Sequence, residues 1–346
     1  MINAMSADGH ALRLATRRNS HRDGELMLVS PSGTRWVPAK TPATMQQLMD
    51  NFDEQVGRLS HRCTVLDSNG WQGAESFDSE ACMAPLPRAY QWADASVYRN
   101  HARLIYKWRK EPIPPRYEIE PLVYQGGSDV MLSGSEDIVA TDESYEIDLE
   151  AEVAIITKDV PMGVSVKAAE DCIALVVLLN DVSLRGLIPS ELSKGFGFYQ
   201  SKPATSFAPI ALTPAALGAL WRDNMPNFKV RISVNGEWFG EPHANVETIF
   251  NCAQVIAHLA RTRSLCAGSI IGLGTISNED PAAGNACITE ARVRQILDGK
   301  ADNELFPYLK HGDRVRIEAV PNSPNLLFGA IDQKVVVRSI TIDSAR

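Results

Sequence analysis

The sequence contains no hydrophobic run long enough to cross a membrane. Its longest apolar run, 172–179, spans eight of the 346 residues and ends at Asn180 and Asp181, whereas a spanning helix needs about 20 apolar residues. The first thirty residues intersperse charged side chains among short apolar pieces and contain no signal-peptide core. We therefore expect a cytoplasmic protein without a membrane partner.

Positive charge and closely spaced cysteines are also scarce. Lys and Arg number 34 against 42 Asp and Glu, a net charge of −8, so we expect no binding to nucleic acid or to anionic membranes. The six cysteines include no C-x-x-C pair, which argues against a disulfide framework or a zinc site. Gly-x-Gly at 195–197 and at 272–274 does not continue into the dinucleotide fingerprint, so nucleotide binding has little support.

The apolar runs and turn residues predict a β-rich α+β fold in two parts. Residues 1–84 contain short apolar runs broken by Asp-Gly and Ser-Gly turns, which indicate hairpins. The sequence Pro-Leu-Pro at 85–87 marks a boundary, and residues 85–346 form the longer part, in which strands outnumber helices. Strands are expected at 153–157, 175–179, 229–234, 270–273 and 314–318, helices at 44–59, 98–109, 166–174 and 245–260, and a hairpin turn at Asn235-Gly236.

Acidic and apolar residues alternate along 146–152. A period of two predicts one strand that carries the side chains of Glu146, Asp148, Glu150 and Glu152 on the same face. Next-but-one residues lie about 7 Å apart in a strand, so these charges repel each other unless a positive charge lies among them. Two interpretations follow: the acids are hydrated on a solvent-facing strand, or they hold a hard divalent cation.

Two further acids favour the cation. Asp181 comes just after the apolar run at 172–179 and Asn180, and a charge at the end of such a buried strand needs a partner. Asp94 lies seven residues before His101. Together with Glu150 and Glu152, these two residues would provide the all-oxygen ligands that Mg²⁺ and Ca²⁺ prefer.

At this point the motifs resemble a known family. Asp-Leu-Glu-Ala-Glu at 148–152, Asn-Asp-Val-Ser-Leu-Arg at 180–185 and Gly-Thr-Ile-Ser at 274–277 occur in this order in the fumarylacetoacetate hydrolase family. Asp94 with His101, followed by Tyr-Gln-Gly-Gly at 124–127, is similar to fumarylacetoacetase-like members in particular.

The resemblance implies a catalytic domain that is a roll of mixed β-sheet at 85–346, preceded by a small SH3-like β-barrel at 1–84. It also implies a homodimer or a larger oligomer. By the same resemblance, Asp94, Glu150, Glu152 and Asp181 bind Mg²⁺ or Ca²⁺, with Mn²⁺ possible, and Glu146 and Asp148 are outer-shell or solvent acids.

The implied reaction is the hydrolysis of a carbon–carbon bond in a β-diketo acid, within the catabolism of tyrosine or other aromatic compounds. His101 would activate water, because imidazole titrates near neutral pH, and Glu290 would orient it. Further positions match oxyanion donors (Lys202 and Arg185) and substrate contacts (Tyr124, Thr275, and one of Arg109 and Lys110).

The sequence departs from the family pattern at two substrate positions. A glutamine of the family is replaced by Ile188, and a tyrosine by Ser96, although Tyr98 is close. These departures leave the acyl group open, so fumarylpyruvate, maleylpyruvate and other acylpyruvates are alternatives to fumarylacetoacetate.

Other functions stay open from the sequence. A 2-keto acid hydratase or a decarboxylase of the same superfamily would use the same acids. A binding module with a structural Ca²⁺ would not need His101, Glu290, Lys202 and Arg185 together. Each of these residues also has an ordinary alternative, such as an unremarkable helix histidine at position 101 or a surface lysine at position 202.

Overall fold

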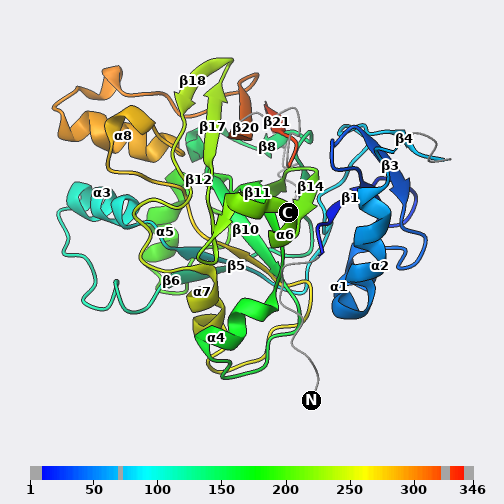
Figure 1. The fold of residues 1–346 in the computed structure, drawn as a ribbon. Coiled ribbons are helices and arrows are strands. Elements are labelled where there is room, and N and C mark those ends of the chain that lie inside the picture. The colour runs from blue at the N-terminus through cyan, green and yellow to red at the C-terminus, as the bar shows by residue number, and fades with distance from the viewer. Residues whose placement is uncertain (1–9, 69–72, 321–327, 339–346) are drawn as a thin grey trace, which may run out of the picture.

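The computed structural model describes residues 10–68, 73–320 and 328–338, and most of its strands join one large mixed sheet (Figure 1). In spatial order this twelve-stranded sheet contains β4 (Glu75–Ser76), β3 (Arg35–Pro38), β2 (Glu25–Val29), β1 (Arg13–Arg17), β14 (Ile210–Leu212), β11 (Ile173–Asn180), β10 (Ala151–Thr157), β19 (Ile270–Gly272), β5 (Trp92–Ser96) and β6 (Leu122–Gly126), with β13 (Ser206–Phe207) beside β11 and β7 (Leu132–Ser133) beside β13.

A second, five-stranded sheet covers part of the first. Its strands are β18 (Glu237–Gly240), β17 (Lys229–Val234), β20 (Arg314–Val320), β21 (Ile331–Val337) and β8 (Ile138–Ala140). Two small ribbons pair β12 (Ser183–Leu184) with β9 (Ile147–Asp148), and β15 (Trp221–Arg222) with β16 (Met225–Pro226). The helices are α1 (Met45–Met49), α2 (Phe52–Thr64), α3 (Arg99–Arg109), α4 (Val166–Ala169), α5 (Ile188–Leu192), α6 (Pro214–Leu217), α7 (Cys252–Leu259) and α8 (Ile288–Leu297).

The sequence places the strands of the core correctly. Every residue of β10 and of β11 is buried, as expected for continuous apolar runs that are covered on both faces. The strands predicted at 229–234, 270–273 and 314–318 are β17, β19 and β20, each within two residues of the predicted bounds. The hairpin turn between β17 and β18 is confirmed, because Asn235 and Gly236 have φ angles of 54° and 82°.

The N-terminal strands are continuous with the main sheet. Strand β1 pairs with β14 in antiparallel register, and Leu14 and Leu28 lie in the same apolar cluster as Leu175 and Val177. The α+β, β-rich fold is confirmed. Within 10–68 and 73–84, however, the strands β1 to β4 form an open antiparallel run and no closed barrel.

The helices follow the sequence less closely. The helix predicted at 98–109 is α3, but the one predicted at 44–59 is interrupted at Asn51, which separates α1 from α2. The helix predicted at 245–260 is shorter: α7 begins only after Asn251, whose side chain forms a capping box with Gln254. The pattern at 166–174 gives the single turn α4 followed by a 3₁₀ turn.

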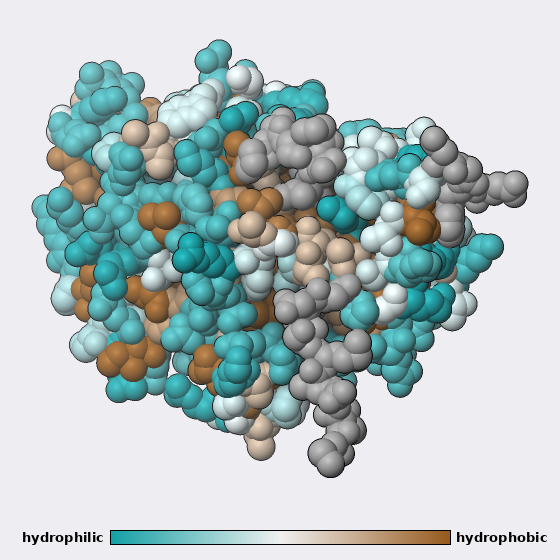
Figure 2. Space-filling view, viewed as in Figure 1, coloured by the Kyte–Doolittle hydropathy of each residue, from teal (hydrophilic) through white to brown (hydrophobic). Residues whose placement is uncertain are grey.

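Two helices that are far apart in the sequence pack together at one side of the molecule. Helix α3 packs against α8, and Figure 1 shows the pair far from β1 and β2. On the face drawn in Figure 2, hydrophobic residues form separate patches in a largely hydrophilic surface. In the described part of the chain, no helix is long and apolar enough to span a membrane.

Candidate active site

An acidic cluster lies where three strands of the main sheet come together. Asp94 is on β5, Glu152 is on β10 and Asp181 directly follows β11. All three are buried, and one carboxylate oxygen of each lies within 4.8 Å of the others. Strand register explains the meeting, because β5 pairs in parallel with β19, which pairs with β10. The structure therefore brings together three of the four acids predicted to bind a metal.

Gly272 leaves the room that Asp94 needs. The two residues are partners in the ladder between β19 and β5. A Cβ atom at Gly272 would lie 2.2 Å from Asp94 Oδ1. Any other residue at this position would displace the carboxylate from the cluster. The Asp94 carboxylate is fixed further by Gly274, whose backbone N–H donates to Oδ1 at 3.1 Å.

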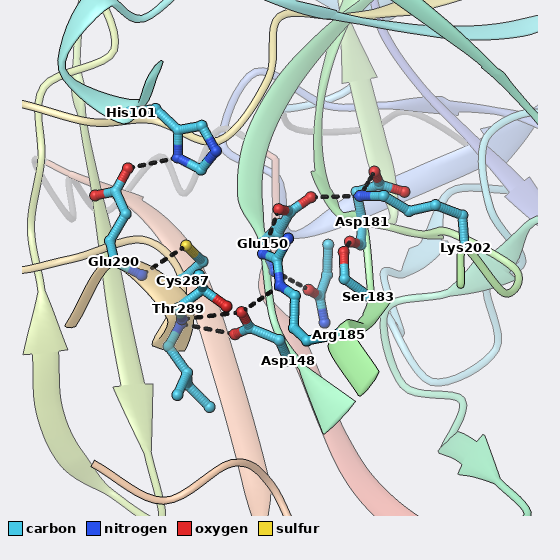
Figure 3. Close-up of polar contacts among 12 residues, drawn as sticks. His101, Asp148, Glu150, Asp181, Ser183, Arg185, Lys202, Cys287, Thr289 and Glu290 are labelled. Atoms are coloured by element: carbon cyan, nitrogen blue, oxygen red, sulfur yellow. Dashed lines mark hydrogen bonds and ion pairs between the residues drawn. The ribbon is translucent and has the colours of Figure 1, made fainter. Parts of the chain in front are cut away.

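Glu150, the fourth predicted ligand, lies beside the cluster and contacts two cations. Its Oε2 accepts from Lys202 Nζ at 2.6 Å, and its Oε1 accepts from Arg185 Nη2 at 2.5 Å. Lys202 Nζ also donates to Asp181 Oδ2 at 2.6 Å, so the ammonium bridges two acids (Figure 3). Burial would lower the pKa of Lys202, but these two carboxylates raise it, and the side chain stays charged.

The prediction of a single acidic strand at 146–152 is wrong. Strand β9 ends at Asp148 and β10 begins only at Ala151, and Glu146 precedes β9 in a left-handed conformation with a φ of 57°. Asp148 is fully buried, so the expectation of a solvent acid is also wrong for this residue. Its carboxylate accepts from the backbone of Ile288 at 2.6 Å and of Thr289 at 3.0 Å, at the first turn of α8, where a negative charge is stabilised.

Asp148 joins two parts of the site. In addition to α8, its Oδ2 accepts from Arg185 Nε at 2.8 Å. The guanidinium is therefore held by two carboxylates, those of Asp148 and Glu150. The period-two pattern singled out Asp148 as an acid of interest. It did not predict that this carboxylate accepts from the first N–H groups of α8, because no local signal in the sequence marks the start of that helix.

The carboxylate of Glu152 is the strongest indication of a cation. Both of its oxygens are buried and have no hydrogen-bond partner among the described residues. Burial raises the pKa of Glu152, and Asp94 and Asp181 raise it further. A carboxylate this enclosed, beside two others, needs either a proton or a nearby cation to offset its charge. The residues present therefore fit a hard divalent ion with oxygen ligands.

His101 and Glu290 form an acid–base pair between α3 and α8. His101 Nδ1 lies 2.6 Å from Glu290 Oε1 (Figure 3). The Glu290 side chain is only 1% exposed against 20% for His101, and its second oxygen accepts from Ser277 Oγ at 3.0 Å. This arrangement leaves Nε2 of the imidazole for a water molecule or substrate.

Cys287 lies beside this pair and belongs to the helix start. Its Sγ accepts from the Glu290 backbone N–H at 3.4 Å, which makes it the N-cap of α8. Burial and the acids Asp148 and Glu290 raise the pKa of Cys287 well above its usual range, so it is a neutral thiol and a poor metal ligand.

Two hydroxyl groups hold Asp181 in place. Tyr124 Oη donates to Asp181 Oδ2 at 2.5 Å, and Thr205 Oγ1 donates to Oδ1 at 2.9 Å. Tyr124 was predicted as a substrate contact, whereas Thr205 was missed. It lies three residues after Lys202 in a segment with no acidic or aromatic pattern, so the sequence offered no signal for it.

A cavity of about 410 Å³ opens beside these groups. The predicted site residues that line it are Asp94, His101, Arg109, Tyr124, Glu150, Arg185, Lys202 and Thr275. Between the two candidates for a carboxylate contact, Arg109 lines the cavity. Lys110 does not, since it is the exposed, left-handed C-cap of α3. Glu152, Asp181 and Glu290 are buried and are not among the residues that line it.

The two departures from the family pattern face the same cavity, which Ser96 and Ile188 both line. Tyr98 does not substitute for the missing tyrosine. It is 1% exposed, and its hydroxyl donates to the backbone carbonyl of Ala244 at 2.9 Å.

The fold and the site define a class of protein: a β-rich α+β enzyme fold with a buried carboxylate cluster beside a histidine–glutamate pair. Two family models match the chain, "Fumarylacetoacetate (FAA) hydrolase C-terminal" over residues 91–336 and "Fumarylacetoacetase N-terminal domain 2" over residues 12–88. The chain belongs to the fumarylacetoacetate hydrolase family.

Individual relatives span several reactions. A fumarylacetoacetase of Caenorhabditis elegans is 23% identical over 88% of this chain and 81% of its own length. Maleylpyruvate hydrolase from Sphingobium sp. SYK-6, solved with manganese(II) and pyruvate, has a TM-score of 0.62 at 16% identity and covers 94% of this chain and 99% of its own. A 2-hydroxyhepta-2,4-diene-1,7-dioate isomerase from Mycobacterium marinum has a TM-score of 0.59 at 15% identity, with 95% and 100% covered.

Proposed function

We propose that this protein hydrolyses a carbon–carbon bond in a β-diketo acid, such as fumarylacetoacetate or a related acylpyruvate. One observation carries the proposal: His101 is paired at 2.6 Å with the buried Glu290 and lines a cavity that also reaches Asp94 and Glu150 of the acidic region. A base and a cation-binding cluster on one cavity are what water attack on a diketone requires.

We propose that Asp94, Glu150, Glu152 and Asp181 bind one divalent cation, Mg²⁺, Ca²⁺ or Mn²⁺. When bound, such a cation withdraws electron density from the keto oxygens of the substrate. The oxygens of Glu152, which accept no hydrogen bond from any residue that the structure describes, support this set, and so does the manganese complex of the maleylpyruvate hydrolase. Glu150 can take part although it contacts Lys202 and Arg185, since each carboxylate oxygen has two acceptor sites.

In this mechanism His101 carries out the proton transfers, and Arg185 and Lys202 stabilise the negative charge that develops. His101 takes a proton from water at Nε2, while its Nδ1–H donates to Glu290, which fixes the ring and stabilises the imidazolium. The resulting hydroxide adds to the carbonyl carbon of the acyl arm, and the cationic Arg185 and Lys202 donate to the oxygen that becomes negative. The carbon–carbon bond breaks with its electron pair on the keto-acid fragment, which the imidazolium protonates.

The remaining cavity residues position the substrate. Tyr124 and Thr275 supply hydroxyl groups, and Arg109 supplies the cation for the substrate carboxylate. Holding the reacting groups in place lowers the activation barrier, because the entropy cost of orienting the substrate is met when it binds rather than at the transition state.

The test is the loss of ultraviolet absorbance of fumarylacetoacetate or an acylpyruvate on addition of protein with Mg²⁺ or Mn²⁺, with the two acid products identified. Failure to cleave any diketo acid under these conditions would refute the proposal.

A 2-keto acid hydratase or decarboxylase is the second candidate, because the fold is shared with an enzyme of a different reaction, the isomerase. It would yield a hydrated product or CO₂ without hydrolytic cleavage.

A further inference from the structure

The outer wall of the cavity is apolar. It is formed by α3, by β6 and by the segment from α5 to residue 198, and the side chains that matter here are Ile105, Trp108, Leu122, Ile188, Leu192 and Phe198. Three of them are unusually exposed for large apolar residues: Trp108 at 43%, Leu122 at 42% and Leu192 at 39%. Contact with an apolar group would remove this surface from water.

Positive charge is limited around the same cavity. Lys202 and Arg185 are each held by two carboxylates. Arg109 is the remaining cation on the lining and has no ion pair within the residues that the structure describes. Glu146, which also lines the cavity, adds a negative charge.

The charges therefore accommodate one free carboxylate. A β-diketo acid already carries a carboxylate next to its diketone, and Arg109 is the group available to bind it. A second carboxylate at the end of the acyl arm, as in a fumaryl group, would have no further unpaired cation on the described lining, which otherwise adds the negative Glu146. Leaving such a charge unpaired in a partly buried site is unfavourable.

We propose that the acyl arm of the substrate is apolar, aliphatic or aryl, and lies along this wall. This inference rests on the proposed function. The reaction would be R–CO–CH₂–CO–CO₂⁻ + H₂O → R–CO₂⁻ + CH₃–CO–CO₂⁻ + H⁺, in which R is a hydrocarbon group. Water supplies the oxygen of the new acid and the hydrogen of the pyruvate methyl group.

The first experiment compares kcat/KM for acetyl-, butanoyl-, hexanoyl-, benzoyl- and fumarylpyruvate with the Mn²⁺-loaded protein. Each methylene buried on the wall should raise kcat/KM by roughly fourfold. Hexanoylpyruvate should therefore exceed acetylpyruvate by more than tenfold, and it should also exceed fumarylpyruvate. Cleavage of the whole series with fumarylpyruvate as the best substrate would overturn the apolar arm and leave the hydrolase intact.

A binding measurement covers the case in which no acylpyruvate is cleaved, which would refute the hydrolase. Trp108 lies on the wall, so hexanoate should change the tryptophan fluorescence of the wild type but not of Trp108→Phe, and fumarate should have a much smaller effect. Equal responses to hexanoate and fumarate would overturn the proposal by a route that does not depend on turnover.

A matched pair of variants tests the wall itself. Leu192→Arg places a cation at the last residue of α5, and Leu297→Arg places one at the last residue of α8, outside the cavity and at a similar exposure of 38%. Leu192→Arg should raise the ratio of kcat/KM for fumarylpyruvate to hexanoylpyruvate by at least tenfold, and Leu297→Arg should leave it unchanged. An unchanged ratio in Leu192→Arg would contradict the proposal. A change in molecular mass by light scattering as its only effect would also contradict it, because the wall would then be a contact between copies of the chain.

Discussion

Two residues that lie 189 positions apart in the chain form the central contact of the site. His101 comes from α3 and Glu290 from α8, and their side chains meet at 2.6 Å. The remaining polar groups are equally tightly paired: Arg185 and Lys202 together contact Asp148, Glu150 and Asp181. The carboxylate of Glu152, in contrast, has no partner among the described residues. These residues lead to separate predictions.

His101→Ala should lower kcat by roughly 10²–10⁴-fold, because general-base catalysis contributes about that much to the rate. Metal content should stay at the wild-type level, since the ring contacts Glu290 and not the acidic cluster. Steady-state kinetics and elemental analysis of the same preparation measure both. Turnover at the wild-type rate would remove His101 from the mechanism.

Glu152→Gln should abolish the stabilisation of the protein by a divalent cation. In the wild type, a cation at a hundred times its Kd adds about 2.7 kcal/mol to the free energy of unfolding, which is several degrees in Tm. The amide keeps the shape of the side chain but removes the charge that the cation neutralises.

Thermal melts in EDTA and in excess Mn²⁺ compare the two proteins, with the exposed Glu237→Gln on β18 as the control. A wild-type Tm that is the same in both solutions, or an undiminished Mn²⁺ shift in Glu152→Gln, would contradict the site assignment.

At the scale of elements, the segment from α5 to Lys202 depends on one buried carboxylate. Glu191 accepts from the backbone N–H groups of Tyr199, Gln200 and Ser201 and from the Ser201 hydroxyl, at 2.5–3.2 Å. Burial alone would raise the pKa of Glu191, but these donors lower it below its usual range. The same segment carries Leu192 and Phe198 to the cavity wall.

Glu191→Gln should loosen this segment, because an amide presents one acceptor oxygen in place of two and adds donors that face N–H groups. We expect KM to rise by roughly tenfold with a smaller change in kcat, and trypsin to cleave faster after the exposed Lys194. Substrate kinetics and timed proteolysis measure these effects, again beside Glu237→Gln. Unchanged kinetics and cleavage would show that Glu191 does not position the segment.

The sequence analysis did not predict helix α8, and the N-terminus of this helix shows why. It begins after Cys287, which is not among the residues that commonly cap helices. The first N–H groups are satisfied by Asp148, which lies 140 residues earlier in the chain. By contrast, the capping box of Asn251 and Gln254 at α7 was visible in the sequence and would have corrected the start predicted at residue 245.

At the scale of the whole molecule, the two parts matched by separate family models share a sheet and a core. Strand β1 pairs with β14, and Leu12 and Leu26, both fully buried, lie in the apolar cluster that also contains Leu175. The site lies in the other half of the same sheet, on β11, β10 and β5, with α3 on the side away from β1 and β2 (Figure 1).

Removal of residues 1–88 should therefore destabilise the remainder strongly. It would expose β14 as an unpaired strand edge and uncover several buried leucine contacts, each worth about 2–5 kcal/mol. We expect the truncated protein to aggregate, and the full chain to unfold in one calorimetric transition. Two separate transitions, the second reproduced by the truncated protein, would show that the parts are independent.

Apolar periodicity and turn chemistry act over a few residues, so they were enough to place five strands of the core, β10, β11, β17, β19 and β20, and the turn at Asn235-Gly236. The residue types of the site were also visible in the sequence. The resemblance to the family added the pairing of His101 with Glu290, which the structure shows. Three of the four acids predicted as metal ligands meet in one buried cluster.

Tertiary structure alone decided how the charges are paired. The alternating acids at 146–152 looked equivalent, yet β9 and β10 are separate strands that pair with different neighbours. Asp148 caps a helix, Glu150 contacts two cations, and Glu152 is enclosed without a hydrogen-bond partner among the described residues. The end of α3 likewise leaves Arg109 on the cavity lining and Lys110 outside it. Which charges pair depends on the order of the strands across the sheet. The local sequence pattern does not specify this order, so it cannot predict the distances between side chains on different strands.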